Sequence, residues 1–275
     1  MSKNKQHKEN LEIKELENKH CKERLKQIKE EKDQYKSKLL AANVTQLFIV
    51  VATEPGFTDD LVSRALVAAE SAGVKAHLIL NKIDISAALP ATRQRLTAYT
   101  QLGYPVHEVS AQDNPTATLA ILRPLLAGQS TILIGQSGMG KSSLLNAWVP
   151  NAAALTQEYS VRLDTGKHTT TACRYFELPE AWGRDESGKL GALIDSPGFQ
   201  EFGLAHMSVS ELQHAFREFK DLLGKCRFHN CAHQSEPDCA VRDAVDRNEI
   251  APERLALFRQ LRSDSKTADT QIQGI

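Results

Sequence analysis

The sequence predicts an α/β fold, in which a mostly parallel β-sheet has helices on both faces and a smaller α-helical region follows. Three observations predict it. From about residue 40, short apolar runs alternate with longer helical patterns, which is typical of a buried parallel sheet. A glycine-rich loop joins one of these runs to a helical pattern. After about residue 203 the apolar runs stop, and three of the five cysteines lie close together at 226–239.

Length and composition are those of a globular protein with one sizeable and one small domain. The chain has 275 residues, 41% of them hydrophobic and 25% charged, and its formal net charge is zero. Bulk charge therefore predicts no partner. The apolar runs are shorter than the roughly 18 residues that a membrane helix needs, and the N-terminus lacks the apolar core of a signal peptide. We expect a cytoplasmic protein without a membrane partner.

Three regions are predicted along the chain. Residues 1–38 are rich in lysine and glutamate and contain no glycine or proline. They are predicted to form a charged helical or disordered extension, with a basic arm on RNA and a short coiled coil as alternatives. Residues 39–203 contain the apolar runs and are predicted to form the sheet domain. Residues 204–275 are predicted to form a helical, zinc-binding domain with a polar tail.

Six short runs are the candidate strands. They lie at residues 46–52, 74–80, 105–111, 130–135, 171–178 and 190–196. Helical patterns such as DLVSRALVAAESAG lie between them. Ligands of open α/β sheets bind beyond the carboxyl ends of the strands, so we expect the functional site in the loops that follow these runs.

The stretch GQSGMGKS, Gly135–Ser142, matches a phosphate-binding loop. It follows the apolar run TILI and precedes the helical pattern SSLLNAWV. Its glycines let backbone N–H groups face phosphates, and a helix N-terminus adds positive potential. Lys141 would reach the β- and γ-phosphates, and Ser142 would ligate Mg²⁺. The predicted nucleotide contacts of this stretch are Gly135, Gln136, Ser137, Gly138, Met139, Gly140, Lys141, Ser142 and Ser143.

Two further stretches predict the rest of the phosphate and magnesium site. LIDSPG ends an apolar run at Asp195, whose carboxylate would lie beside the magnesium ion, and Gly198 would give a backbone N–H to the γ-phosphate. GKHTTT, at 166–171, offers a threonine that would close over the γ-phosphate. We assign this role to Thr170, although three consecutive threonines also suit a strand and the choice among them stays open.

The stretch NKID, Asn81–Asp84, predicts recognition of guanine. The Asp84 carboxylate can accept hydrogen bonds from both N1–H and the exocyclic amine, and adenine offers no such pair of donors. Asn81 could hold O6 or N7, and the Lys82 stem could pack beside the ring. Ala111, in the later stretch VSA, could offer its backbone N–H to the base. The predicted base contacts are Asn81, Lys82, Ile83, Asp84, Ser110 and Ala111.

These motifs occur in an unusual order. The base-reading stretches precede the phosphate loop, whereas they come last in an ordinary GTPase. Cutting the order of elements after the DSPG stretch and joining the old ends gives the present sequence, and domain termini often lie close enough for such a join. We therefore predict a circularly permuted P-loop GTPase domain in which the segment after Gly198 runs directly into the C-terminal region.

The stretch CRFHNCAHQSEPDC predicts a structural zinc site. Three thiolates and one imidazole are a set that zinc binds tetrahedrally, and four protein ligands leave no open position for catalysis. The zinc ion would hold a small domain together. The predicted ligands are Cys226, Cys231, His233 and Cys239. His229 is an alternative histidine ligand that we rank below His233.

Together these motifs resemble one family, the circularly permuted GTPases of ribosome assembly called RsgA or YjeQ. The matching stretches are AANVTQLFIVVA, NKID, GQSGMGKSSLLN, GKHTTT, DSPGFQEFGL and the Cys₃His spacing, over roughly residues 39–265. The resemblance implies a monomeric GTPase that converts GTP to GDP and phosphate with Mg²⁺ and contains one Zn²⁺. It also implies a partner, the maturing small ribosomal subunit with its rRNA, which stimulates hydrolysis.

The family pattern leaves the water-orienting residue open. Members resemble GTPases that lack the usual glutamine after the Asp-x-x-Gly element, and Phe199, whose ring cannot orient water, stands at that place here. The histidine of the switch motif is suggested for the role in the family and aligns with His168. The predicted catalytic residues are His168, Lys141 and Thr170. The alternative function is a GTP- or GDP-dependent clamp on the ribosome or RNA with negligible turnover.

The N-terminal region departs from the family pattern. Family members carry an N-terminal OB-fold barrel that contacts ribosomal RNA, whereas residues 1–38 suggest helix rather than short strands. We expect the barrel to be absent, replaced or truncated, and ribosome binding to rest more on the zinc region and the switch segments. The candidate RNA contacts, or alternatively a solvated face, are Arg242, Arg247, Arg254, Arg259 and Arg262.

Overall fold

The computed structural model describes residues 44–149, 174–195, 204 and 207–272. The chain divides into two units, Met1–Leu39 and Leu40–Ile275, and every described residue belongs to the second unit. The predicted N-terminal extension therefore lies outside the described residues. The boundaries predicted at 38/39 and 203/204 stay predictions.

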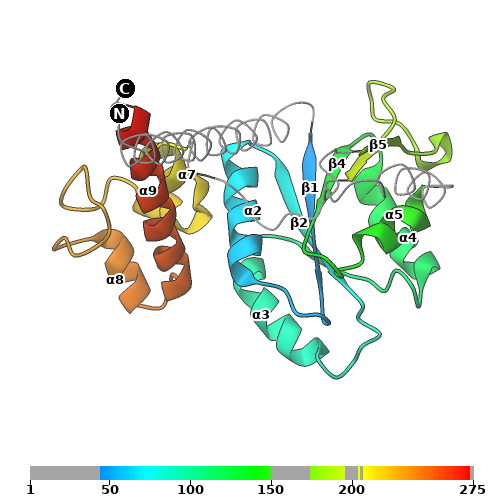
Figure 1. Cartoon of the computed structure of the whole chain (residues 1–275), viewed down its shortest axis with the longest axis horizontal. Helices are drawn as coiled ribbons and strands as arrows, with labels where there is room; N and C mark the ends of the chain where they lie inside the picture. Colours follow the sequence, from blue (N-terminus) through cyan, green and yellow to red (C-terminus); the bar gives the residue numbers. More distant parts are fainter. Residues whose placement is uncertain (1–43, 150–173, 196–203, 205–206, 273–275) are drawn as a thin grey trace, which may run out of the picture. The chain divides into compact units, whose positions relative to one another are not determined.

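A six-stranded sheet forms the centre of the described chain (Figure 1). Its strands are β1 (Gln46–Ala52), β2 (Lys75–Asn81), β3 (Val106–Glu108), β4 (Ser130–Ile134), β5 (Arg174–Glu177) and β6 (Ala192–Asp195), in the order β3-β2-β1-β4-β6-β5. β5 runs antiparallel to β6, and all other neighbours are parallel. The predicted mostly parallel sheet is confirmed.

Helices cover both faces of the sheet, which explains why its central strands read as continuous apolar runs. All seven residues of β1 and all five of β4 are buried. One face is covered by α2 (Asp59–Ser71) and α3 (Leu89–Gln101), and the other by α4 (Pro115–Leu126) and α5 (Lys141–Trp148) (Figure 1). A short 3-10 helix, η1 (Glu180–Trp182), follows β5.

The strand order creates a topological switch point between β1 and β4. From β1 the chain proceeds outward through β2 to β3, whereas from β4 it reaches β6 and β5 on the opposite side. Loops diverge from such a point and leave a crevice beyond the carboxyl ends of the strands, where ligands bind. The phosphate loop follows β4 and the NKID stretch follows β2, so both lie at this edge of the sheet.

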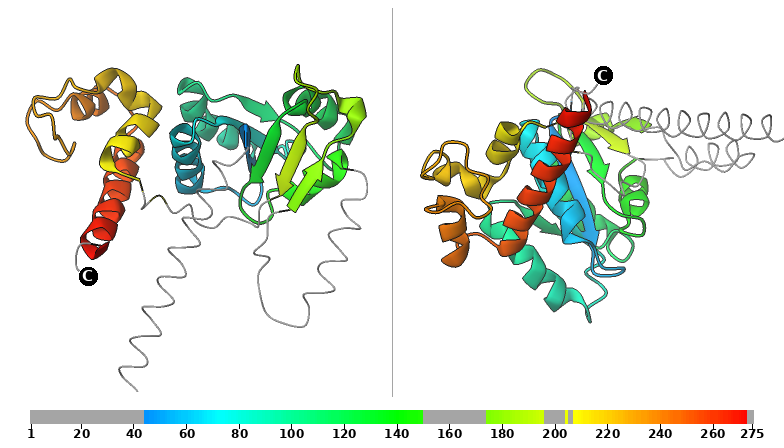
Figure 2. Two further views of the ribbon diagram at one scale, coloured as in Figure 1. Left: turned by 90° about the horizontal axis from the view of Figure 1, so that it is seen from above. Right: turned by 60° about the vertical axis from the view of Figure 1, so that its left-hand side comes forward.

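The described residues beyond 203 form helices and no strand. They are α7 (Val209–Ala215), the 3-10 helix η2 (Arg217–Leu222), α8 (Ala240–Asp246) and α9 (Pro252–Ile272), and α9 lies beside α7 (Figure 2). The buried rings of Phe216, Phe219 and Phe258 pack with centroids 5.0 to 5.5 Å apart. Of the helices that the structure describes, none has the length and apolar character that would let it cross a bilayer.

Ion pairs join these helices to each other and to the sheet domain. Arg217, in η2, donates from Nε to Glu70 Oε1 of α2 at 2.6 Å, and its guanidinium lies 3.9 Å from the Tyr104 ring centroid. Within the C-terminal helices, Arg254 pairs with Glu218 at 2.5 Å, and both side chains are less than 10% exposed. Arg254 is thus neither an available RNA contact nor part of a solvated face, because its charge is buried against a carboxylate.

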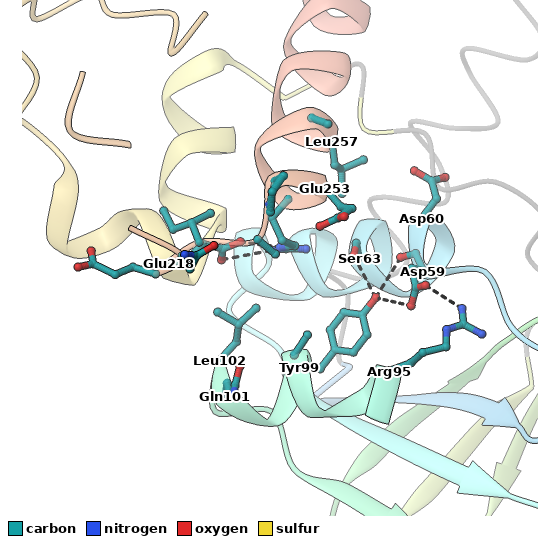
Figure 3. A pocket seen from close by; sticks show the side chains of 18 of the residues that line it. Asp59, Asp60, Ser63, Arg95, Tyr99, Gln101, Leu102, Glu218, Glu253 and Leu257 are labelled. Atoms are coloured by element: carbon teal, nitrogen blue, oxygen red, sulfur yellow. Dashed lines mark hydrogen bonds and ion pairs between the residues drawn. The ribbon is translucent and has the colours of Figure 1, made fainter. Parts of the chain in front are cut away.

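A cavity of about 760 Å³ lies beside the Glu218–Arg254 pair (Figure 3). Its walls come from α2, α3, η2, the connection between α8 and α9, and α9 itself. On the sheet-domain side, the Tyr99 hydroxyl points at Ser63 and Asp59, and Arg95 pairs with Asp59 at 2.7 Å. The polar groups of this wall therefore bond mainly to each other.

Candidate nucleotide and metal sites

The loop between β4 and α5 has the backbone geometry of a phosphate-binding loop. Gly140 is the N-cap of α5 and has φ of +92°, a left-handed conformation that favours glycine. A Cβ atom at Gly140 would also collide with the side-chain amide of Asn81, and one at Gly135 would collide with the Val50 carbonyl of β1. The first N–H groups of α5 have no partner within the helix and suit an anion.

The Lys141 ammonium group lies within this loop. Its Nζ donates to the carbonyl oxygens of Gly135 at 2.5 Å and Gln136 at 2.9 Å. An ammonium has three N–H donors, so one stays available for a phosphate oxygen. Burial lowers the pKa of Lys141, and the nearby Asp195 carboxylate opposes this shift.

Asp195 and Ser142 lie at the same edge of the sheet. Asp195 ends β6, which lies between β4 and β5 in the sheet, and it pairs in register with Leu133 of β4. Ser142 is exposed in the first turn of α5. A carboxylate and a hydroxyl are the oxygen ligands that Mg²⁺ prefers, so these two residues fit a magnesium ion beside bound phosphates.

Asn81 connects the base-reading stretches to the phosphate loop. It is 2% exposed. Its Nδ2 donates to the Met139 carbonyl at 3.0 Å, and its Oδ1 accepts from the Ala111 N–H at 3.0 Å. An amide NH₂ has two N–H donors, so one stays available for guanine O6 or N7. In this structure the Ala111 N–H donates to Asn81, and the contact between this N–H and the base stays a prediction.

The Asp84 carboxylate is exposed and held from one side. The Ser110 hydroxyl donates a short hydrogen bond to Oδ1 of Asp84, which leaves the second carboxylate oxygen as an acceptor. Ser110 follows β3, the neighbour of β2, so the two predicted base-reading stretches do meet. Ile83 donates its N–H to the Val109 carbonyl at 3.3 Å, which joins the same two loops.

Lys82 adopts φ of +62°, a left-handed conformation that is uncommon outside glycine. The Thr53 hydroxyl donates to its carbonyl at 2.9 Å, and its Nζ donates to the Glu54 carbonyl at 2.8 Å. These two bonds hold the strained residue in place.

Sequence reasoning missed the loop after β1, residues 53–58. Besides the bonds to Lys82, the Thr58 N–H donates to Oε1 of Gln136 at 3.0 Å. The Pro55 ring lies so close to Gly138 that a Cβ there would meet it at 3.2 Å. The loop thus contacts both the NKID stretch and the phosphate loop. Its sequence TEPGFT offers only proline and glycine, which are typical of any turn, and so gave no signal.

Part of the predicted nucleotide site lies outside the described residues. This part consists of His168, Thr170 and Gly198, together with Phe199. Their roles stay predictions from the sequence.

The second candidate site is the cysteine-histidine cluster, where the side chains of all four predicted ligands meet. These are Cys226, Cys231, His233 and Cys239, and their ligand atoms all lie within 4.8 Å of one another. The two sulfur atoms of Cys226 and Cys239 are 3.9 Å apart, and the His233 Nδ1 lies 3.7 and 3.3 Å from them. Around a tetrahedral zinc ion, S···S is about 3.8 Å and S···N about 3.6 Å. The cluster therefore fits one zinc ion. His229 is exposed and not part of it.

Hydrogen bonds around the cluster orient the histidine. The His233 Nε2 lies 3.1 Å from the Gln213 side-chain amide, which leaves Nδ1 facing the thiols. Such a second-shell bond fixes the tautomer of a metal ligand. Arg259 donates from Nε to the His233 carbonyl at 2.8 Å. This arginine, a candidate RNA contact or part of a solvated face from the sequence alone, therefore helps to hold the cluster. Burial raises the pKa of the Cys231 thiol to about 12, so metal binding would have to displace its proton.

The fold and these two sites define a class of protein: a P-loop domain whose base-reading loops precede its phosphate loop, joined to a small metal-binding helical domain. A model of the RsgA GTPase family matches residues 21–205. The chain belongs to the RsgA GTPase family and is a GTP hydrolase.

Individual relatives agree with this membership. A protein of Paraburkholderia phymatum named small ribosomal subunit biogenesis GTPase RsgA is 55% identical, over 83% of this chain and 70% of the relative. One of Ralstonia nicotianae with the same name is 52% identical, over 85% and 72%.

Solved structures agree as well. The crystal structure of YjeQ from Thermotoga maritima matches with a TM-score of 0.63 and 29% identity, over 81% of this chain and 72% of that one. The crystal structure of YloQ, described as a circularly permuted GTPase, matches with a TM-score of 0.61 and 26% identity, over 82% and 69%. The predicted circular permutation and the predicted family are confirmed.

Proposed function

We propose that the protein hydrolyses GTP as an assembly factor of the small ribosomal subunit, and that the subunit stimulates hydrolysis. Its curated relatives at more than 50% identity are named for small-subunit biogenesis, and this is the process in which the protein acts. The observation that carries the nucleotide assignment is Asn81, which joins the phosphate loop to the base-reading loops through two buried hydrogen bonds.

The guanine specificity is assigned to Asp84. Its two carboxylate oxygens, one of which also accepts from Ser110, can accept from the N1–H and the exocyclic amine of guanine. Asn81 would donate its second N–H to O6 or N7. Lys82 and Ile83, which lie between Asn81 and Asp84 in the chain, would line the base site. Adenine would leave the carboxylate facing an acceptor, and the site would reject it.

The phosphate contacts are assigned to the backbone of Gly135–Ser143 and to Lys141. Mg²⁺, held by Ser142 and Asp195, would neutralise charge that develops on the transferred phosphoryl group. The spare N–H of Lys141 would bind the β- and γ-phosphate oxygens. From the sequence, Thr170 and the Gly198 N–H would contact the γ-phosphate.

The role of orienting the attacking water is assigned to His168, since Phe199 occupies the place of the glutamine that usually does so. The same observation favours a second candidate function. Without a water-orienting group, the protein would act as a GTP- or GDP-dependent clamp on the ribosome or its RNA with negligible turnover.

The cysteine-histidine cluster is assigned one structural zinc ion, which the distances between its donor atoms support. Three thiolates and an imidazole saturate the metal and leave it no catalytic position. We further propose that the protein acts as a monomer in the cytoplasm, where it binds small-subunit rRNA.

Single-turnover hydrolysis of GTP with and without small ribosomal subunits tests the proposal. We expect slow hydrolysis alone and a large increase with subunits. Tight, GTP-dependent binding to subunits without faster hydrolysis would support the clamp, and absence of binding would contradict both functions.

A matched pair of variants tests His168. His168→Ala should abolish the stimulation while GTP still binds. His214→Ala, which removes an exposed histidine of α7, should retain it.

A further inference from the structure

The turn between the first two metal ligands carries an exposed aromatic ring. Residues 227–230 are all exposed, although Cys226 before them is half-buried and Cys231 after them is buried. Phe228 is 41% exposed and is the one exposed large hydrophobic side chain among residues 204 and 207–265, whose burial the structure describes. A single exposed ring needs no explanation by itself. Two further properties distinguish this one.

The first property is that the turn is held at both ends. The Arg227 N–H donates to the Asp238 carbonyl at 3.1 Å, and the Cys231 N–H donates to the Phe228 carbonyl at 3.2 Å. Cys226 and Cys231 both belong to the metal cluster, which would fix the turn from inside. A ring that is ordered in advance loses little conformational entropy when it binds a partner.

The second property is positive charge next to the ring. The Arg227 guanidinium carbon lies 5.6 Å from the Phe228 ring centroid, and Lys225, three positions before Phe228 in the chain, is exposed. Arg227 also pairs with Asp238 at 3.1 Å, but these side chains are 62% and 71% exposed. An exposed ion pair contributes little free energy, so a phosphate group can replace the carboxylate.

We propose that this turn, residues 225–229, binds an unpaired nucleotide of RNA. The base would stack on the Phe228 ring, and the Arg227 and Lys225 side chains would contact the flanking phosphates. Proteins bind unstacked RNA bases with aromatic and guanidinium planes, and such stacking tolerates any base because each has a π-face. The inference rests on the proposed function, since small-subunit rRNA would supply the nucleotide.

A protein groove is the less suitable partner for this turn. Grooves of that kind take several apolar side chains, such as the i, i+3 and i+4 residues of a helix. The turn offers one ring with the Arg227 guanidinium beside it. The structure therefore favours a nucleic acid as partner, and its binding should weaken strongly as the salt concentration rises.

The test compares Phe228→Ala with Phe228→Trp in the full-length, zinc-loaded protein. Binding is measured to small ribosomal subunits, with a non-hydrolysable GTP analogue, and to a short unstructured single-stranded RNA. We expect Phe228→Ala to weaken both affinities about 5- to 100-fold, and Phe228→Trp to retain them. Ile121→Ala removes a side chain of similar exposure on α4 and should change neither.

Phe228→Ala could also weaken binding by releasing zinc, so a second variant that keeps the ring is needed. Arg227→Gln keeps the ring and should lower the salt dependence of RNA binding by about one phosphate contact. An unchanged salt dependence together with an unchanged Phe228→Ala affinity would overturn the proposal.

The remaining outcomes separate this inference from the proposed function. Wild-type binding to subunits that Phe228→Ala leaves unchanged overturns the stacking contact, but the proposed function stands. Weakened binding to subunits with unchanged binding to free RNA overturns the nucleotide as partner and indicates a ribosomal protein. If the wild type binds RNA through Phe228 but never binds subunits, the stacking contact stands and the proposed function fails.

Discussion

The sheet domain and the C-terminal helices are stabilised in different ways. In the sheet domain, β1 and β4 are wholly buried between two layers of helices. In the C-terminal helices, the rings of Phe219 and Phe258 pack against His233, and much of the remaining structure depends on charged and metal-binding groups. A small domain buries too little apolar surface to be stable by this alone, so a bound metal and buried ion pairs supply the remaining stability. Metal removal, substitutions and a change of pH should therefore each affect one of the two regions more than the other.

Removal of zinc should have the largest effect. Structural zinc contributes on the order of 10 kcal/mol to the folding of small metal domains. We expect Cys231→Ser, or chelation, to unfold the C-terminal helices while the sheet domain keeps its nucleotide affinity. Hydrogen exchange resolved along the chain would measure both. Cys173→Ser, at an isolated cysteine, is the control. Equal loss of protection in β1 and α8 would contradict the separation.

The buried ion pair of the C-terminal helices should come next. Arg254→Met leaves the Glu218 carboxylate buried without its partner, which should lower the free energy of unfolding by about 3 kcal/mol. Arg247→Met removes the partner of Glu249 from an exposed ion pair in the same region and should leave the free energy of unfolding almost unchanged. Denaturant titration measures both. Similar effects of the two variants would show that burial of the pair is not what matters.

In the sheet domain, Gly140→Ala should mainly affect nucleotide binding. An alanine there must adopt a left-handed φ, at about 1–2 kcal/mol, and its methyl group would displace Asn81. We expect GTP affinity to fall about 100-fold by calorimetry. Gly188→Ala has a similar φ of +81° but open space around it, so it should leave affinity unchanged. Equal GTP affinity in both variants would show that GTP binding does not require the close approach of Gly140 and Asn81.

A drop in pH should have the smallest effect in the sheet domain. Burial first, then His107 and Lys75, lower the pKa of His77 to about 4. The unfolded chain therefore binds the proton first, and stability should fall as the pH decreases from about 6.5 to about 4. His77 is partly exposed, so we expect a loss of about 1 kcal/mol after solvent screening. In His77→Gln this part of the pH dependence should disappear, and an unchanged slope would contradict the assignment.

The sequence predicted what depends on local pattern. The apolar runs gave the strands, the phosphate loop stood out because strand, glycines and helix follow each other, and the cysteine spacing predicted a cluster that the structure brings together. What the sequence could not predict depends on contacts between distant residues. The burial of Arg254 requires Glu218, 36 positions away, and the Ala111 N–H bonds to Asn81, 30 positions away. No periodicity records such pairs.

The central claim is that a carboxylate preceding the phosphate loop in the chain reads the base. Asp84→Asn tests it most directly, because an amide can no longer accept from both donors of guanine but can donate to the C2 carbonyl of xanthine. Affinities for GTP, XTP and ATP should be measured on the wild type and the variant. We predict that GTP affinity falls at least about 100-fold while XTP affinity rises. Unchanged preference for GTP in Asp84→Asn would contradict the account.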